Sequence, residues 1–290
     1  MSYKRILYRL LFLGLTILII PFLPIMIIFL GISSPEYVIY GTLNLNTVHS
    51  FSSWAVYYNF LMQILSFDFG LSTSSGQPVI VDVFSALLES IKPISFALLI
   101  SLSLGTIIGI IISRYERIRT IWNRAESIFY IPIIVFSYLM LYFMDFLGID
   151  FLSNIKYLVA GLILSIYPLY IVSKAISTTI KSVSNSDYFT FHKACGFSDK
   201  FIWIKFCKRF IIVDYLSFFE NLLIFMFGFI FFVETPFGIY GVGHKFVLAI
   251  QRFDYPLIIG FCVFSIILFS FIGLISEAIK LLLDPREVNI

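Results

Sequence analysis

Few residues of this chain could carry out chemistry, and the first group to consider lies between positions 192 and 207. His192, Cys195 and Cys207 are residue types that bind metal ions, but nothing supplies a fourth ligand. The expectation is therefore a partner-facing imidazole and two buried thiols. No metal site is therefore predicted. In the apolar segments no nucleophile stands beside a base, so no catalytic residue is predicted either.

The chain also lacks the phosphate loop with the pattern G-x-x-x-x-G-K-[ST]. It therefore does not bind and hydrolyse ATP by that route, and no cofactor is predicted for the chain itself.

Glu220 is the one charged residue in the apolar run Tyr215–Val233. An ionisable side chain at membrane depth indicates a functional contact, here with a cargo molecule or with another helix. The alternative is that this helix begins near Phe210, so that the carboxylate meets water or a lysine. The sequence leaves both interpretations open.

The composition decides which elements must position these residues. Of the 290 residues, 60% are hydrophobic and only 13% are charged, and the mean hydropathy is +0.98. Such values lie outside the range of soluble globular proteins. We expect an all-α, polytopic membrane protein in contact with the lipid bilayer. The net charge of +3 points to no acidic partner, and no nucleic acid is predicted.

Six runs that are nearly free of charge are long enough to cross a bilayer. They are Leu10–Pro35, Pro93–Ser113, Ser127–Met144, Tyr157–Ser173, Tyr215–Val233 and Tyr255–Ser276. The segment Phe51–Phe67 is also apolar, but it is rich in Ser, Tyr, Asn and Gln. We expect it to form a helix on or near the outer surface.

The basic residues set the orientation. With six spans and both termini in the cytoplasm, 16 of the 20 Lys and Arg residues lie on the cytoplasmic side, as the positive-inside rule requires. This topology divides the chain into a first span (1–35), an extracytoplasmic segment (36–92), a five-helix core (93–283) and a cytoplasmic tail (284–290). The predicted location is a bacterial cytoplasmic membrane.

The longest polar interruption in the second half of the chain is Asn185–Arg209, on the cytoplasmic side. Tyr188, Phe191, His192 and Cys195 recur at the spacing of one helix face. Gly196 stands where a helix ends in a left-handed residue, and Ser198 can cap the helix that follows. The pattern predicts two short amphipathic helices joined by a glycine turn at the membrane surface.

The external stretch from Glu234 to Pro256 is the second informative segment. Gly238, Gly241 and Gly243 predict a turn, and residues 246–253 predict one or two helical turns. Its apolar residues indicate that it dips back into the outer mouth of the protein. Such a re-entrant segment needs protein or a water-filled cavity around it, which favours transport over signalling.

Four motifs in register resemble one known family, the permease subunits of bacterial ATP-binding-cassette importers for dipeptides, oligopeptides and nickel. The motifs are Asp68-Phe69-Gly70 with Gly76-Gln77-Pro78-Val79; Asp187-Tyr188 with Ala194-x-Gly196; Glu234-Thr235-x-Phe237 with Gly241-x-Gly243 and Asp254-Tyr255-Pro256; and Asp284-Pro285-Arg286.

The resemblance implies roles for particular residues. It implies an ATPase-coupling element formed by Asp187, Tyr188, Phe191, His192, Ala194 and Gly196. It implies an external gate formed by Glu234, Phe237, Gly241, Gly243, Asp254 and Tyr255. Glu220 and Gly228 are possible cavity residues. The implied partners are a second homologous permease, two ATPase subunits that bind the ATP, and an extracytoplasmic substrate-binding protein.

The chain departs from the family pattern in its aromatic content. Phe189, Phe191 and His192 stand where relatives carry small or basic residues, which implies an unusually aromatic ATPase cleft. Phe225, Phe227 and Phe229 replace most of the glycines of the fifth span, which leaves Gly228. The alternatives to peptide import are a permease for nickel or a metal chelate, an ion-coupled secondary transporter that uses Glu220, and a membrane scaffold.

Overall fold

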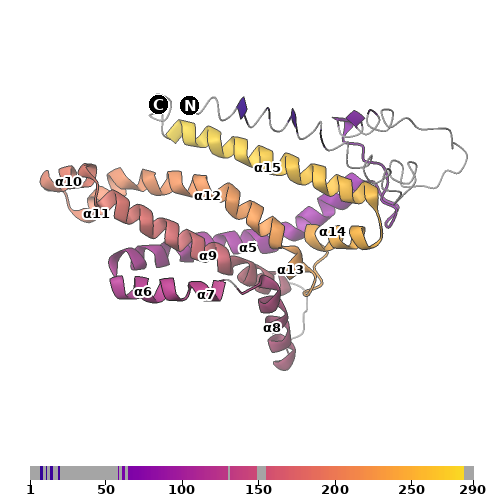
Figure 1. Cartoon of the computed structure of the whole chain (residues 1–290), viewed down its shortest axis with the longest axis horizontal. Coiled ribbons are helices and arrows are strands. Elements are labelled where there is room, and N and C mark those ends of the chain that lie inside the picture. Colours follow the sequence, from indigo (N-terminus) through magenta and orange to yellow (C-terminus); the bar gives the residue numbers. More distant parts are fainter. Residues whose placement is uncertain are drawn as a thin grey trace, which may run out of the picture. The chain divides into compact units, whose positions relative to one another are not determined.

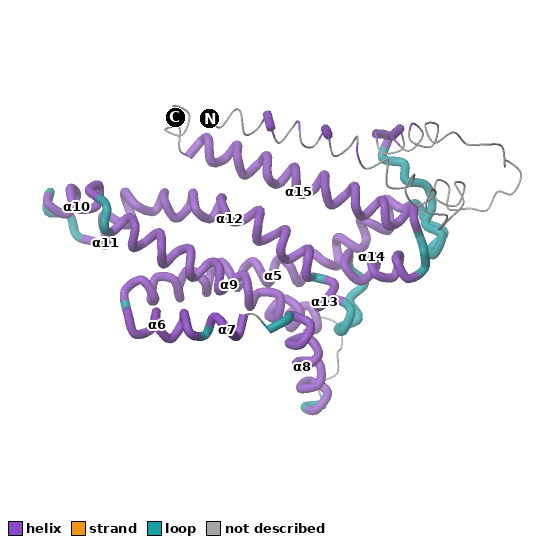
Figure 2. The backbone as a smooth tube through the Cα atoms, viewed as in Figure 1, coloured by secondary structure: helices purple, strands orange, loops and turns teal. Residues whose placement is uncertain are grey.

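The structure is a computed structural model that describes residues 65–129, 131–148 and 155–283, together with isolated positions between 7 and 62. Most of the predicted span Leu10–Pro35 and most of the predicted surface helix Phe51–Phe67 lie outside the described residues, as does the tail 284–290. The described residues form helices and connecting loops without a strand (Figures 1 and 2). The predicted all-α class is therefore confirmed for this part of the chain.

The helices follow one another closely along the chain. In order they are α5 (Val79–Arg114), α6 (Glu116–Arg124), α7 (Glu126–Phe129), α8 (Ile133–Phe146), α9 (Ile155–Ser184), α10 (Asp187–Ala194), α11 (Asp199–Ile202), the π-helix η1 (Trp203–Cys207), α12 (Lys208–Phe229), α13 (Phe231–Glu234), α14 (Val242–Gln251) and α15 (Tyr255–Leu283).

Four of the described helices are long and apolar enough to cross a membrane. They comprise α5, α9, residues Phe210–Phe229 of α12, and residues Tyr255–Ser276 of α15. Each contains or overlaps a span predicted from the sequence, and the last has the predicted bounds. The number of spans and the orientation of the termini remain predictions.

The predicted span Ser127–Met144 is not one continuous helix. Residues Glu116–Phe129 and Ile133–Phe146 meet at an angle of 88°, so together they form at most a broken span. Figure 1 shows α8 turning away from α7 at this point. The cause is Pro132, which lies at the N-cap of α8 in an extended backbone conformation (ψ 135°) and has no N–H to continue a helix. Pro168, by contrast, lies inside the continuous helix α9.

Helix α5 begins earlier than predicted, at Val79 instead of Pro93. The charge-free run marked only its apolar part, because Asp82, Glu89 and Lys92 lie in the preceding turns. The predicted extracytoplasmic segment 36–92 therefore ends in helix.

The chain forms two compact units, which are described separately. The first comprises 1–90 with 240–275, and the second comprises 91–239 with 276–290. The core of the first unit joins Phe69 and the first turns of α5 to α14 and α15, through residues that include Val79, Ala249 and Phe261. Gly260 permits this packing, since a Cβ there would lie 2.3 Å from the Val79 Cγ1 atom.

In the second unit, Val172 and Ile176 of α9 pack against Leu222 of α12. Helix α5 approaches α9 through two glycines four residues apart. A Cβ at Gly105 would lie 2.9 Å from the Val172 Cβ atom, and one at Gly109 would lie 2.8 Å from the Ser173 carbonyl oxygen. Small residues at this spacing allow close helix packing in membranes, where burial of apolar surface supplies little driving force.

Candidate functional site

The predicted external gate falls on both units. In the first unit, a short loop precedes α5, with an isolated bridge between Leu71 and Pro78. Gly70 (φ +76°) and Gly76 (φ +69°) have left-handed backbone conformations, which glycine adopts at little cost. These two glycines belong to the external motif that carried the family resemblance.

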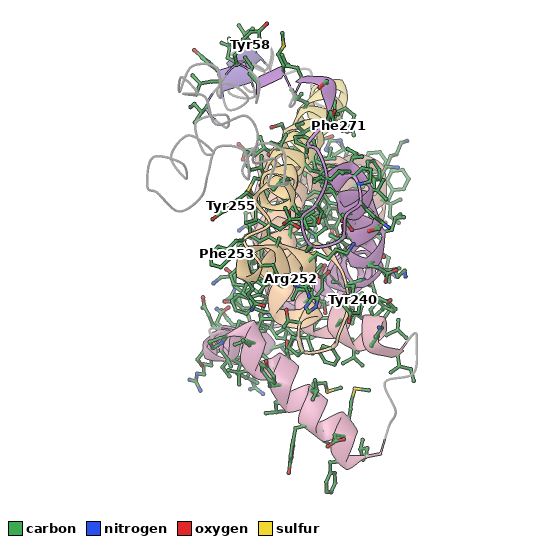
Figure 3. The ribbon with its side chains drawn as sticks, turned by 90° about the vertical axis from the view of Figure 1, so that its right-hand side faces the viewer. Tyr58, Tyr240, Arg252, Phe253, Tyr255 and Phe271 are labelled. Carbon is green, nitrogen blue, oxygen red and sulfur yellow. The ribbon has the colours of Figure 1, made fainter. Side chains whose placement is uncertain are left out.

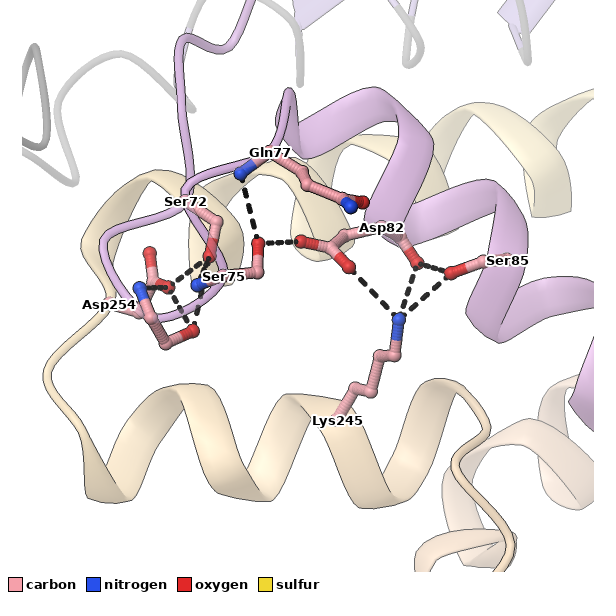
Figure 4. A network of polar contacts seen from close by, with 8 residues as sticks. Ser72, Ser75, Gln77, Asp82, Ser85, Lys245 and Asp254 are labelled. Carbon is pink, nitrogen blue, oxygen red and sulfur yellow. Dashed lines mark hydrogen bonds and ion pairs between the residues drawn. The ribbon is translucent and has the colours of Figure 1, made fainter.

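Asp254 anchors this loop to the segment between α14 and α15. Its side chain is fully buried. Its Oδ2 atom accepts hydrogen bonds from the Ser72 hydroxyl at 2.6 Å and from the Ser74 backbone N–H and hydroxyl at 3.0 and 2.7 Å. Its Oδ1 atom accepts from the Leu257 N–H in the first turn of α15 at 3.3 Å. Figure 4 shows Asp254 beside the serine loop.

These contacts fix the charge of Asp254. Burial alone raises the pKa of a carboxyl group, because it penalises the charged form. Here the hydrogen bonds from Ser72, from Ser74 and from the Thr73 backbone outweigh burial, so the pKa of Asp254 lies below its ordinary value. The side chain is therefore a carboxylate at neutral pH.

A second part of the same network connects α14 to α5. The Lys245 Nζ atom donates to the Asp82 Oδ1 atom at 3.0 Å and to the Ser85 hydroxyl at 2.8 Å. The Ser75 hydroxyl donates to the Asp82 Oδ2 atom at 2.5 Å. Asp82 thus contacts the loop through Ser75 and α14 through Lys245 (Figure 4). Asp82, Ser85 and Lys245 were not predicted as functional residues.

The glycines of the gate differ from the prediction. Only Gly238 has a left-handed conformation (φ +59°), whereas Gly241 is extended and Gly243 lies inside α14. The helix spans Val242–Gln251, so it starts earlier than the predicted 246–253. The Val242 N–H at its first turn donates to the Ser90 hydroxyl at 2.7 Å.

The remaining predicted gate residues are buried. Tyr255 begins α15 in the first unit and is 6% exposed. Glu234 and Phe237 belong to the second unit and are 0% and 5% exposed. The Glu234 carbonyl oxygen accepts from the Ile239 N–H at 2.9 Å, which closes the turn after α13.

The predicted ATPase-coupling residues lie on and just after α10, in the second unit. Ser186 caps this helix by accepting a hydrogen bond from the Phe189 N–H at 3.3 Å. Asp187 lies in the first turn, where its negative charge interacts favourably with the positive end of the helix dipole. Ala194 is the last helical residue, and Gly196 follows in the left-handed conformation (φ +87°), as predicted.

The second predicted helix is not a separate element. Ser198 occupies the N-cap position of α11, but its side chain makes no capping hydrogen bond, so its predicted cap is absent. Helix α11 continues through the π-helix η1 directly into α12. The glycine turn is therefore joined to the long helix α12 without an intervening loop.

Helix α10 has one exposed aromatic face. Tyr188 and Phe191 are 44% and 65% exposed, and the centroids of the Tyr188 and His192 rings lie 4.5 Å apart. The His192 Nδ1 atom forms a hydrogen bond with the Tyr188 carbonyl oxygen at 2.8 Å. Cys195 is exposed on this face, contrary to the expectation of two buried thiols, whereas Cys207 is buried.

The opposite face of α10 holds it in place through Phe189. This ring is buried in a cluster with Val183, Ile202 and Cys207, and its centroid lies 6.1 Å from that of Trp203. The periodicity within one helix could not identify Phe189 as an anchor, because its partners lie before Ser186 or beyond Gly196.

The two possible cavity residues lie on α12. Glu220 is half-buried, and Gly228 is exposed with no atom within 4 Å of the place where its Cβ would be. Because α12 begins at Lys208, Glu220 lies near the middle of the span Phe210–Phe229. The candidate span starts at Phe210, as one interpretation of Glu220 assumed, although the helix itself continues back through η1 and α11.

Comparisons with known proteins agree with this architecture. A sequence model of the family described as binding-protein-dependent transport system inner membrane component matches residues 101–289. The chain is 27% identical to the dipeptide transport system permease protein DppB of Bacillus subtilis, over 79% of this chain and 78% of that protein. It is 25% identical to the protein of the same name from Lactococcus lactis subsp. cremoris, over 80% of each chain.

Proposed function

The chain belongs to the family of binding-protein-dependent transport system inner membrane components, and from that premise we propose that it forms one half of the translocation pathway of a peptide importer. Its proposed partners are a second homologous permease, two ATPase subunits and an extracytoplasmic substrate-binding protein. The proposed location is a bacterial cytoplasmic membrane, with six spans and both termini in the cytoplasm. Dipeptides are the proposed cargo, because two relatives carry the name dipeptide permease.

The exposed aromatic face of α10 is the observation that carries this proposal. Tyr188 and Phe191 expose apolar surface on a helix that also carries the charged residues Asp187 and Lys193. Exposed aromatic side chains of this kind are typical anchors of protein interfaces. This face docks into a cleft of an ATPase subunit.

The contacts behind this face give it a rigid connection to the membrane. Phe189 packs against Ile202 just before η1, and against Val183 at the end of α9. Displacement of α10 by the ATPase therefore moves the ends of α9 and of the continuous helix α11–η1–α12 together. A tightly packed core transmits such a displacement because it deforms little.

The predicted external segment around α14 is the proposed contact for the substrate-binding protein. Tyr240 and Phe253, which flank α14, are 64% and 60% exposed, and Arg252, which precedes Phe253 in the chain, is also exposed (Figure 3). These side chains form the docking surface for the substrate-binding protein. The buried network around Asp82 and Asp254 holds α14 and its flanking residues in position.

The proposal is tested in proteoliposomes that contain the complete transporter. Phe191→Ala removes an exposed ring and leaves the fold intact, so we expect weaker ATPase binding and slower ATP-dependent dipeptide uptake. Ile121→Ala, which removes a side chain of similar exposure from α6, is the control. Normal uptake and normal ATPase affinity in Phe191→Ala would overturn the coupling role of this face. ATP-dependent uptake of nickel with no uptake of dipeptide would establish the metal-chelate alternative.

The half-buried carboxylate of Glu220 in a membrane span favours one further candidate, ion-coupled transport. It predicts uptake driven by a proton gradient in vesicles without ATPases, and loss of this uptake in Glu220→Gln. Uptake that requires ATP and is unaffected by Glu220→Gln excludes it.

A further inference from the structure

A cleft of about 900 Å³ lies at the base of α10, within the second unit. It is bounded by the end of α5, the end of α9, α10, α11, η1 and the start of α12. Since α5, α9 and α12 are all candidate membrane spans, a cleft at the point where two of them end and the third begins lies at a membrane surface. This placement does not depend on the cargo or on which side of the membrane is cytoplasmic.

The cleft is strongly cationic. Five different helices each contribute one basic residue to its lining, namely Arg114, Lys181, Lys193, Lys200 and Lys208. Among the described residues that line it, Asp199 is the only acidic one, and it pairs with Lys193 at 3.1 Å. A concave surface with one sign of charge and low-dielectric walls concentrates counter-ions, so its ligand is an anion.

The walls of the cleft are apolar. Ile110, Ile180 and Ile211 come from the three membrane helices, and Trp203 lies beside them. A free inorganic anion would leave these side chains in contact with water. A ligand with an anionic head and hydrocarbon chains satisfies both the charge and the walls, and tryptophan is a residue typical of the membrane interface.

We propose that this cleft binds an anionic phospholipid, with its phosphate among the five basic side chains and its acyl chains along Ile110, Ile180 and Ile211. Basic pockets between membrane helices are known to hold such headgroups. Phe189, which anchors α10, also lines the cleft. The bound lipid therefore contacts the base of the element that we propose to contact the ATPase.

The test measures lipid bound to the purified complete transporter in mixed micelles of phosphatidylglycerol and phosphatidylcholine, by native mass spectrometry. We expect selective retention of phosphatidylglycerol. Lys181→Gln combined with Lys208→Gln is expected to weaken it about 30-fold, because each basic residue near an anionic headgroup contributes about five-fold. The matched control is Arg117→Gln with Arg124→Gln, which removes two exposed charges of α6 outside the cleft and is expected to leave retention unchanged.

Three further measurements make the result decisive. Lys181→Arg with Lys208→Arg preserves the charge and should restore retention, which separates loss of binding from misfolding. Phosphatidylglycerol with short acyl chains should bind more weakly than the long-chain lipid; equal binding, or full displacement by inorganic phosphate, would identify a phosphate site and overturn the lipid assignment. Equal losses in the α6 control would also overturn it, since the lipid would then respond only to the general positive charge of this surface. Dipeptide uptake is scored separately, so failure of the lipid assignment leaves the proposed function untouched.

Discussion

The Nζ atom of Lys245 lies 3.0 Å from the Oδ1 atom of Asp82, and this ion pair joins α14 to the first turns of α5. Both side chains are largely shielded from solvent, at 23% and 9% exposure. Ser75 also donates a hydrogen bond to the Asp82 carboxylate, and the Lys245 ammonium group donates one to Ser85. Both charged groups therefore have additional hydrogen-bond partners. This arrangement holds the outer helix α14 in one position.

Removal of one partner should therefore be costly. We expect Lys245→Met to lower the free energy of unfolding of the first unit by about 1–3 kcal/mol, because it leaves the Asp82 carboxylate buried without its cation. Thermal unfolding of the purified protein measures this effect, and limited proteolysis around α14 shows whether the loss is local to this helix. Arg119→Gln, which breaks the exposed pair with Glu116, is the control and should change stability by less than about 1 kcal/mol. Equal effects of the two substitutions would contradict the role assigned to the buried pair.

The second prediction concerns the acid stability of the loop that Asp254 anchors. Because the pKa of Asp254 is lowered in the folded state, the carboxylate stabilises the fold fully above its ordinary pKa of 3.8. This contribution is lost as the pH falls from there through the lower folded-state value. Proteolysis of the 70–78 loop should therefore accelerate as the pH is lowered from about 6 to about 3.

Asp254→Asn removes the titrating group and serves as the comparison. It should open the loop already at neutral pH, at a cost of about 1–3 kcal/mol, since the amide cannot accept all of the serine hydrogen bonds. Its remaining pH dependence should be weaker than that of the wild type. An unchanged acid response in the variant would show that another group controls the loop.

The third prediction concerns the close packing of α5 on α9 at Gly109. Gly109→Ala places a methyl group 2.8 Å from the Ser173 carbonyl oxygen, so the two backbones must separate, at a cost of about 1–3 kcal/mol. Gly228→Ala is the same change at an open position of α12. It should be neutral or stabilising by up to about 1 kcal/mol, because alanine favours helix. Melting temperatures of the two variants in detergent compare them directly, and a more stable Gly109→Ala would contradict the packing.

Local patterns in the sequence predicted several elements correctly. The charge-free run Tyr255–Ser276 coincides with a helical segment long and apolar enough to cross a membrane, and Gly196 has the predicted left-handed backbone. Both depend on properties of neighbouring residues alone. The same runs could not show that α5 extends outward to Val79, because hydropathy does not distinguish a polar helical turn from a loop.

Long-range contacts were beyond the sequence. Asp82 and Lys245 are 163 positions apart, and no periodicity connects them. The anchor Phe189 was assigned to an aromatic coupling surface together with Phe191, but one ring is buried and the other is exposed. A single helix pattern of eight residues does not decide which of its two apolar faces meets the rest of the protein.

The last prediction tests the turn after α10. Gly196 has φ +87° and no atom within 4 Å of its Cβ position, so any side chain fits in space but strains the backbone. We expect ATP-dependent uptake to fall in the order Gly196, Asn, Ala, Val, since asparagine tolerates the left-handed conformation and a β-branched residue tolerates it least. The alanine variant should lose about 1 kcal/mol of stability through backbone strain.

Gly76 offers the matched control, because it has φ +69° with equally open surroundings in the loop before α5. Gly76→Val should strain that loop without changing ATPase affinity, whereas Gly196→Val should weaken both ATPase affinity and the stimulation of ATP hydrolysis by cargo. Intact uptake and stimulation in Gly196→Val would show that the angle of α10 does not carry the coupling.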